Sequence, residues 1–203
     1  MTILSVNKTK GTDGRSMRSF FVGTAVPILF FVRDRMRRKS RILAHGALIA
    51  ALYTALTYLQ NFLIPGSATW AIQFRVSEAL CVLALFTPAA IPGLTVGCVL
   101  FNLTFAGALP LDVPVGGLAT ALAVGGMYCL RKVTVKGYPL PAMLLPAVSN
   151  ALLVGWELSV YVGGGFWLNA LYVAIGEAAV LLTLGTALFY TLRSRGLDKR
   201  LFY

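Results

Sequence analysis

Four of the seven acidic residues in this sequence stand within or beside long apolar runs. Glu157 and Glu177 lie inside such runs, whereas Glu78 and Asp112 lie near the start of one. An ionisable side chain inside a membrane costs about 3 kcal/mol or more, so it usually has a partner or a functional role. These carboxylates are therefore the first candidates for a ligand site.

The residues around Glu157 form a polar stripe on one predicted helix. Asn150, Glu157 and Tyr161 are separated by seven and four positions, which places them on the same helical face. A polar face on an otherwise apolar helix is expected to point into a helix bundle. The structural alternative is that Glu157 and Glu177 pair with Arg75, or with Asn and Tyr side chains, only to fix helix packing.

The segment Gln73–Leu80 combines a guanidinium, a hydroxyl and a carboxylate at the start of a predicted helix. Glu78 suits that position because the helix dipole favours negative charge there, and Arg75 can pair with it from three residues earlier. Asn102 and Asp112 add polar groups to the elements that follow. The candidate binding residues are Arg75, Glu78, Asn102, Asp112, Asn150, Glu157 and Glu177. Because acceptors outnumber the single guanidinium, they predict a ligand that is cationic or rich in hydrogen-bond donors.

The elements that must position these residues are membrane helices. Hydrophobic residues make up 58% of the 203 positions and charged residues only 12%, unlike the composition of a soluble domain. A helix needs about 20 apolar residues to cross a bilayer. The sequence predicts an all-α membrane protein, a bundle of six transmembrane helices at about 43–64, 77–86, 94–108, 114–130, 141–161 and 166–192. The second helix is short for a full span unless it begins near Trp70.

Basic residues mark the predicted cytoplasmic side. The net charge is +11, and the basic residues cluster before residue 42, in the loop at 131–138 and after Leu192, leaving only Arg75 elsewhere. Under the positive-inside rule this places both termini of a multi-pass cell-membrane protein in the cytoplasm. The loops at 65–76, 107–113 and 163–165 then converge on the outer side, where they could cover a pocket. This charge distribution argues against nucleic-acid binding.

Residues 1–35 differ from the rest of the chain. Their apolar run at 20–32 is shorter than a span and is followed by arginines rather than by a small-residue cleavage site. We therefore expect an N-terminal extension at 1–35 that is dispensable, and a six-helix substrate-binding domain at 36–203.

The cysteines and the lone histidine predict no metal site, disulfide framework or cofactor. Cys81, Cys98 and Cys129 stand in apolar segments without CxxC spacing, and His45 has no histidine neighbour.

The first predicted membrane helix carries small residues at a spacing of four. Ala47, Ala51 and Ala55 form one stripe, and Gly46 and Ala50 belong to the adjacent one. Small residues at this spacing let another helix approach closely. The approaching helix is either part of the same bundle or part of a separate membrane subunit.

The sequence resembles the QueT family of queuosine-precursor transporters, which are substrate-binding S components of energy-coupling factor (ECF) transporters. The resemblance covers about Arg37 to Arg195, and its most specific part is the Gln-Phe-Arg-Val-Ser-Glu stretch at 73–78. Further matching stretches lie at 88–98, 112–120 and 176–177, together with Asn102 and Asn150.

The resemblance implies an S-component-like bundle that captures its ligand from the extracellular side. It implies a coupling membrane subunit and two ATPase subunits as partners, with Ala47, Ala51 and Ala55 as the contact with the coupling subunit. The implied ligand is a 7-deazaguanine such as preQ1, preQ0 or queuine, whose ring Trp70, Trp156 or Tyr161 could cover. The sequence contains no GxxxxGK[ST] loop, so the partners would hydrolyse ATP and this chain would not be an enzyme.

Two other functions compete with this one. A self-sufficient proton-coupled secondary carrier for a small cationic or donor-rich metabolite would use Glu157 or Glu177 as its proton site. Internal repeats with broken helices would favour such a carrier, and the sequence shows no convincing repeat. A membrane scaffold that transports nothing would have no need of embedded carboxylates.

Overall fold

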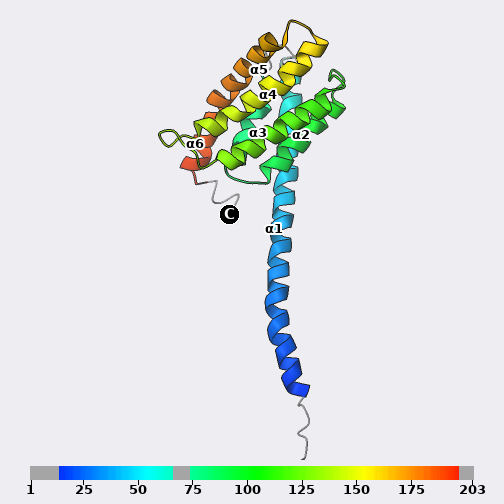
Figure 1. The fold of residues 1–203 in the computed structure, drawn as a ribbon, viewed down its shortest axis with the longest axis vertical. Coiled ribbons are helices and arrows are strands. Elements are labelled where there is room, and N and C mark those ends of the chain that lie inside the picture. The colour runs from blue at the N-terminus through cyan, green and yellow to red at the C-terminus, as the bar shows by residue number, and fades with distance from the viewer. Residues whose placement is uncertain (1–13, 66–73, 197–203) are drawn as a thin grey trace, which may run out of the picture. The chain divides into compact units, whose positions relative to one another are not determined.

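The computed structural model describes residues 14–65 and 74–196, which are built from helices (Figure 1). The chain divides into two compact units, Met1–Arg41 and Ile42–Tyr203. The elements in chain order are α1 (Gly14–Leu63), η1 (Val76–Leu85), α2 (Ala90–Thr104), η2 (Asp112–Gly116), α3 (Gly117–Leu130), α4 (Leu140–Tyr161), α5 (Phe166–Val180), η3 (Leu181–Gly185) and α6 (Thr186–Ser194). The all-α prediction is confirmed for the described residues.

The first unit contains the amino-terminal part of α1. The sequence predicted a separate short apolar run at 20–32 and a helix beginning at residue 43, but α1 is continuous from Gly14. The intervening stretch at 33–41 contains five Arg, one Lys and one Met, which favour helix, and no Pro or Gly, so nothing in it interrupts the backbone hydrogen bonds.

Four helical segments are long and apolar enough to cross a membrane: Arg38–Leu63, Asp112–Leu130, Leu140–Tyr161 and Phe166–Ser194. η1 and α2 are also apolar, but they have 10 and 15 residues. At their rises per residue they cover roughly 20 and 22 Å, against a hydrocarbon core about 30 Å thick. Of the six predicted transmembrane helices, four therefore have the length and composition of a span within the described residues, and η1 and α2 are shorter apolar helices.

η1 takes the place of the second predicted helix and is a 3₁₀ helix. Most of its side chains are buried, including Ser77, Glu78 and Cys81. A 3₁₀ helix rises more per residue than an α-helix, so the same ten residues reach deeper into the bundle. This position brings η1 against α3 and η3.

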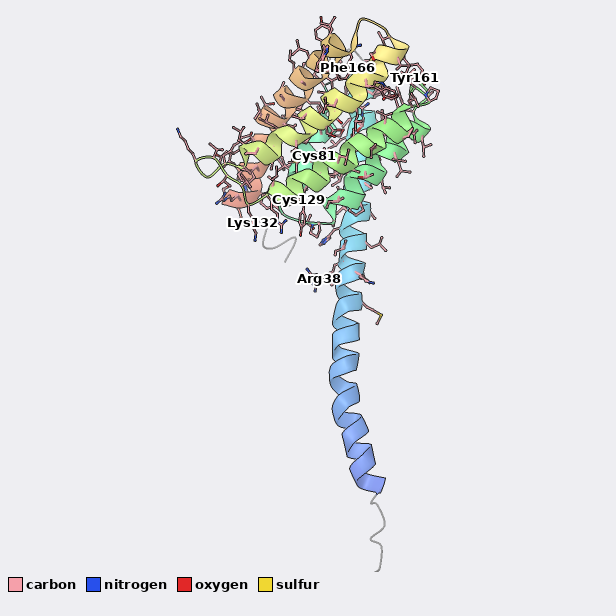
Figure 2. The ribbon with its side chains drawn as sticks, in the orientation of Figure 1. Arg38, Cys81, Cys129, Lys132, Tyr161 and Phe166 are labelled. Atoms are coloured by element: carbon pink, nitrogen blue, oxygen red, sulfur yellow. The ribbon has the colours of Figure 1, made fainter. Side chains whose placement is uncertain are left out.

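In the second unit, α4 packs along both α3 and α5 (Figure 1). The apolar core consists of a large cluster, which includes Leu94, Met127 and Met143, and a small one formed around Val154 and Val173. Figure 2 places Lys132 at one end of this unit, and Tyr161 and Phe166 at the other. We call these the Lys132 end and the Tyr161 end.

The part of α1 in the second unit touches α2 backbone to backbone. A Cβ on Gly93 would lie 2.7 Å from the carbonyl oxygen of Gly46, and one on Gly97 would lie 2.9 Å from that of Ala50. Thr54 Oγ1 also donates to the Gly97 carbonyl at 3.1 Å. The stripe of Gly46 and Ala50 therefore packs within the bundle.

Adding a methyl group at this contact is expected to weaken the fold. Gly93→Ala should lower the free energy of unfolding by about 1 to 3 kcal/mol, because the new Cβ must displace the α1 backbone. The matched control is Gly125→Ala on α3, where a Cβ meets nothing within 4 Å. The control should be neutral or stabilising by up to about 1 kcal/mol, since glycine is a poor helix former. Thermal unfolding of the purified protein in detergent measures both, and equal shifts would contradict the close contact.

Candidate binding site

A layer of polar side chains separates the two apolar clusters. On α4, Asn150 lies between Ala147 of the large cluster and Val154 of the small one. On α5, Glu177 follows Val173 of the small cluster by one helical turn. Asn150 is 5% exposed and Glu177 is 1% exposed. The apolar core is therefore interrupted by polar groups where α4 and α5 meet.

A hydrogen bond between Asn150 and Glu177 joins these two helices. Asn150 Nδ2 donates to Glu177 Oε1 at 2.9 Å. The helix backbones are close, because a Cβ on Gly155 would lie 2.7 Å from the Cα of Ala170. The second oxygen, Glu177 Oε2, is buried and receives no hydrogen bond from any residue that the structure describes. One acceptor of this carboxylate is thus left for another donor.

Glu157 lies nearer the Tyr161 end of α4. It is seven positions from Asn150, or about 10 Å along the helix axis. Within residues 14–65 and 74–196, no group donates a hydrogen bond to either of its buried carboxylate oxygens. The Asp112 side chain is an electrostatic and hydrogen-bonding neighbour of Glu157, but an ionised carboxylate supplies no donor. Both oxygens of Glu157 therefore lack the donors that a buried carboxylate needs.

Glu78 is held very differently. Tyr53 Oη donates to Glu78 Oε1 at 2.5 Å, and Cys81 Sγ donates to Glu78 Oε2 at 3.1 Å. The Glu78 backbone N–H donates to the carbonyl of Arg75 at 2.9 Å, which begins the 3₁₀ helix. Figure 2 shows Cys81 in the middle part of the bundle. Each oxygen of Glu78 thus already accepts a hydrogen bond from the protein.

Polar side chains of α1 fasten the segment that leads into η1. Thr57 Oγ1 lies 2.7 Å from Ser77 Oγ, and Gln60 bonds the backbone on both sides of Arg75 through the Phe74 carbonyl and the Val76 N–H. Thr57 and Gln60 are not among the residues predicted from the sequence. The available signal is their spacing from Tyr53, at four and seven positions, which places all three on one face of α1.

Asn102 and Asp112 are engaged in the connection between α2 and η2. Asn102 Nδ2 donates to the backbone carbonyl of Asp112 at 2.7 Å, and the Leu109 N–H donates to Asp112 Oδ2 at 2.6 Å. A Cβ on Gly116 would lie 2.8 Å from Asn102 Nδ2, so glycine leaves the space that this amide needs. Both predicted site residues therefore have local hydrogen bonds that organise the loop.

The buried charges do not balance. Among the described residues, the buried charged side chains are Glu78, Glu157, Glu177 and Arg75. The Arg75 guanidinium is within electrostatic range of all three glutamates. If the three carboxylates are ionised, one guanidinium leaves an excess of negative charge, which a cationic or donor-rich ligand would offset.

The predicted aromatic residues are not buried with the carboxylates. Trp156 is 48% exposed and Tyr161 is 42% exposed, although their neighbour Glu157 is 1% exposed. The predicted stripe therefore divides, with Asn150 and Glu157 inside the bundle and Tyr161 at the exposed end of α4. Trp70 lies outside the described residues.

The carboxylate layer is closed in this conformation. Glu78, Glu157 and Glu177 each have 1% of their surface exposed, so a ligand reaches them only if the surrounding elements move apart. In the described part of the chain, no three His, Cys, Asp or Glu side chains are grouped to hold a metal ion. The arrangement suits recognition of an organic ligand by hydrogen bonds and charge.

The alanine stripe of α1 lies on a different face from the glycine contact. Ala47, Ala51 and Ala55 are exposed, whereas Gly46 and Ala50 are buried against α2. The bundle itself therefore uses only one of the two small-residue stripes, and the other remains on its surface.

The apolar helical spans, together with the polar side chains buried between them, are those of a multi-pass membrane protein. A family model described as QueT transporter matches residues 43–194. The chain belongs to the QueT transporter family, which confirms the resemblance noted in the sequence.

One curated relative is the Queuosine precursor transporter QueT of Lactococcus lactis subsp. cremoris (strain MG1363). It is 42% identical to this chain over 77 residues, which are 36% of this chain and 41% of that protein. The match therefore spans less than half of the relative. No solved structure matches the chain.

The Tyr53 hydroxyl is expected to be essential for stability. Tyr53→Phe should lower the free energy of unfolding by about 1 to 3 kcal/mol, because Glu78 Oε1 loses its donor in a buried place. Tyr58→Phe is the matched control, since Tyr58 Oη donates to Thr104 Oγ1 at 2.7 Å from an exposed position. Its loss should be under about 1 kcal/mol. Thermal unfolding in detergent compares them, and an equal loss in the control would show that burial of the Glu78 bond is unimportant.

Proposed function

We propose that this chain is the substrate-binding S component of an ECF-type importer for a queuosine precursor of the 7-deazaguanine class. Membership of the QueT family and the name of the Lactococcus relative support a transport role and this ligand class. The main observation in support of the binding site concerns Glu157 and Glu177. Both oxygens of Glu157 and one of Glu177 are buried, and the described residues supply no donor to them.

The chemistry of a 7-deazaguanine matches these oxygens. Its ring N1–H and exocyclic amine are two parallel donors that one carboxylate accepts together. PreQ1 and queuine also carry an ammonium group, which preQ0 lacks, and this group suits a second carboxylate. Asn150, which bonds Glu177, lies seven residues before Glu157 on α4. Glu157 and Glu177 are therefore about 10 Å apart along the helix axis. A ligand with donors at both ends fits this spacing, so preQ1 and queuine are favoured over preQ0.

The other predicted residues take supporting roles in this proposal. Glu78 contributes negative charge from a position held by Tyr53 and Cys81, and Asn150 orients Glu177. Asn102 and Asp112 shape the loop at the mouth of the site, where Arg75 adds its charge. Trp156 and Tyr161 cover the ring only if their side chains turn inward on binding, and Trp70 remains a candidate from the sequence alone.

Capture of the ligand is proposed to occur on the extracellular side. The basic loop and the basic tail predict that the Lys132 end faces the cytoplasm, as both termini do. The carboxylate layer is reached from the opposite, Tyr161 end, because Asp112 and the α4–α5 turn lie there. Opening of the loops at that end would admit the ligand.

The proposed partners are a coupling membrane subunit and two ATPase subunits. The sequence has no phosphate-binding GxxxxGK[ST] loop, so ATP hydrolysis would occur in those subunits. The exposed stripe of Ala47, Ala51 and Ala55 is the proposed docking surface, because small side chains permit close helix approach in a membrane.

A proton-coupled secondary carrier is the second candidate, because buried carboxylate oxygens without a hydrogen-bond donor also suit a proton-binding site. Uptake assays in cells that lack the chain's own partners distinguish the two. An S component binds its ligand when purified alone, and the bound molecule is identified by mass spectrometry, but it transports only when ATPase subunits are present. Uptake by the chain alone that depends on a proton gradient would establish the carrier instead.

Replacing Glu157 or Glu177, the two carboxylates with oxygens that lack a donor, should weaken ligand binding. Glu157→Gln and Glu177→Gln keep the side-chain shape but lose the charge-assisted bond, which costs about 1.5 to 3 kcal/mol, or roughly ten- to a hundredfold in affinity. Calorimetric titration of preQ1 into the purified variants measures this, with melting temperatures as the test of folding.

Glu78→Gln is the matched control for these variants. Its oxygens already accept bonds from Tyr53 and Cys81, so the new amide should lower the melting temperature more than it changes affinity. Unchanged preQ1 affinity in both Glu157→Gln and Glu177→Gln would leave these glutamates as packing groups.

A bulky side chain on the alanine stripe should separate binding from transport. Ala51→Trp blocks close helix approach on the exposed face of α1 while leaving the buried carboxylates untouched. We expect preQ1 affinity of the isolated chain to stay within about twofold and uptake by the assembled complex to fall at least about tenfold. Leu152→Trp, at an exposed position of α4, is the control that should preserve both. Equal damage to affinity and uptake in Ala51→Trp would refute the docking role.

A further inference from the structure

A cavity of about 540 Å³ opens at the Lys132 end of the second unit, away from the carboxylate layer. Its apolar lining includes Phe86 and Phe189, and its polar lining comes from Arg131, Thr134 and Arg193. The volume is in the range of small-molecule sites. Three separate segments supply these residues, namely the residue after η1, the loop after α3, and α6. The cavity is thus a product of the tertiary fold.

Both guanidinium groups of the cavity are oriented by aromatic residues. The Arg131 Cζ lies 3.8 Å from the centroid of the Tyr128 ring, and Arg131 Nη1 donates to the Tyr128 carbonyl at 2.5 Å. The Arg193 Cζ lies 5.8 Å from the centroid of Phe189. Neither guanidinium forms an ion pair with a carboxylate of the described residues. An arginine has five N–H donors, so most donors of both side chains remain for a ligand.

The loop that carries Arg131 and Thr134 is fixed to α6. Tyr138 Oη lies 2.5 Å from Thr186 Oγ1, and the Tyr138 ring stacks on Tyr190 with centroids 6.1 Å apart. Because this contact ties the loop to the helix that bears Arg193, the two arginines are held on one cavity.

The cavity lies at a predicted membrane boundary. Three of the spanning segments have an end beside it, at Leu130, Leu140 and Ser194. Further basic residues follow in the sequence, including Lys132, Lys136 and the Lys-Arg pair of the tail. Basic pockets in this position attract anionic lipid headgroups.

We propose that this cavity binds the phosphate headgroup of an anionic phospholipid from the surrounding bilayer, together with the apolar part of the lipid next to that headgroup. The planar guanidiniums of Arg131 and Arg193 match phosphate oxygens, with the Thr134 hydroxyl as a further donor. Phe86 and Phe189 receive the apolar part next to the headgroup. This site is separate from the ligand site and does not depend on the proposed transport function.

The experiment uses the full chain, purified in an uncharged detergent, and measures lipid binding by native mass spectrometry together with thermal stability. The probes are phosphatidylglycerol, phosphatidylcholine and inorganic phosphate. Phosphatidylglycerol should bind and raise the melting temperature more than phosphatidylcholine, whose choline cation offsets its phosphate. Arg193→Gln should weaken phosphatidylglycerol binding about tenfold or more, because charge-assisted bonds are lost.

Two further variants keep this test decisive. Arg131→Gln should weaken lipid binding in the same way, but it also removes contacts with Tyr128. Arg193→Gln is therefore the main test variant, because Arg193 is exposed. Arg195→Gln removes a charge near the cavity that does not line it, and should leave phosphatidylglycerol binding within about twofold.

The outcomes separate the sources of the phosphate. Stabilisation by inorganic phosphate equal to that by phosphatidylglycerol, with the same dependence on Arg193, would support phosphate recognition and replace the lipid by a free anion. Equal losses in Arg193→Gln and Arg195→Gln would overturn the site in favour of general surface charge. If Arg193→Gln abolished assembly with partner subunits but left phosphatidylglycerol binding unchanged, the lipid site would be overturned in favour of a protein contact.

Discussion

A carboxylate buried among apolar helices must find hydrogen-bond donors, and this requirement organises the centre of the molecule. The three buried glutamates meet it to different extents. Glu78 accepts bonds from Tyr53 and Cys81, Glu177 accepts one bond from Asn150, and Glu157 accepts none from the described residues. The number of hydrogen bonds that the protein donates thus falls from Glu78 to Glu177 to Glu157, which leaves free acceptor oxygens on the last two. A ligand with hydrogen-bond donors would satisfy these remaining oxygens, and the proposed binding site rests on this need.

The satisfied member of this series also explains how a short 3₁₀ helix is held in the bundle. η1 has only ten residues, and its first turn is tied to α1 by the bonds of Thr57 to Ser77 and of Tyr53 to Glu78. α1 reaches α2 at the same time, because Gly93 and Gly97 let the backbones touch. The described part of α1 in the second unit therefore acts as a central support. Its remaining face, with the alanine stripe, is exposed.

The two ends of the second unit differ in chemistry. Toward the Tyr161 end the Glu157 carboxyl group offers buried hydrogen-bond acceptors, and at the Lys132 end a cavity is lined by two guanidinium groups next to aromatic rings. An apolar cluster around Met127 and Met143 lies between them. Under the two proposals, this separation would let one end recognise a donor-rich ligand while the other end binds an anionic lipid.

The sequence by itself determined the class of protein, the approximate helix positions and the family, because hydropathy, basic clusters and the Gln-Phe-Arg-Val-Ser-Glu motif are local features. It also identified Asn150, Glu157 and Glu177 as interior polar groups, since helical periodicity is readable from spacing. Only the tertiary structure decided that η1 is a ten-residue 3₁₀ helix, that Trp156 is half exposed, and that Tyr53 donates to Glu78. These outcomes depend on which donor comes within about 3 Å of which acceptor across different helices. Spacing within one helix carries no such information. For the same reason, only the fold shows that Arg131 and Arg193, which are distant in sequence, line one cavity.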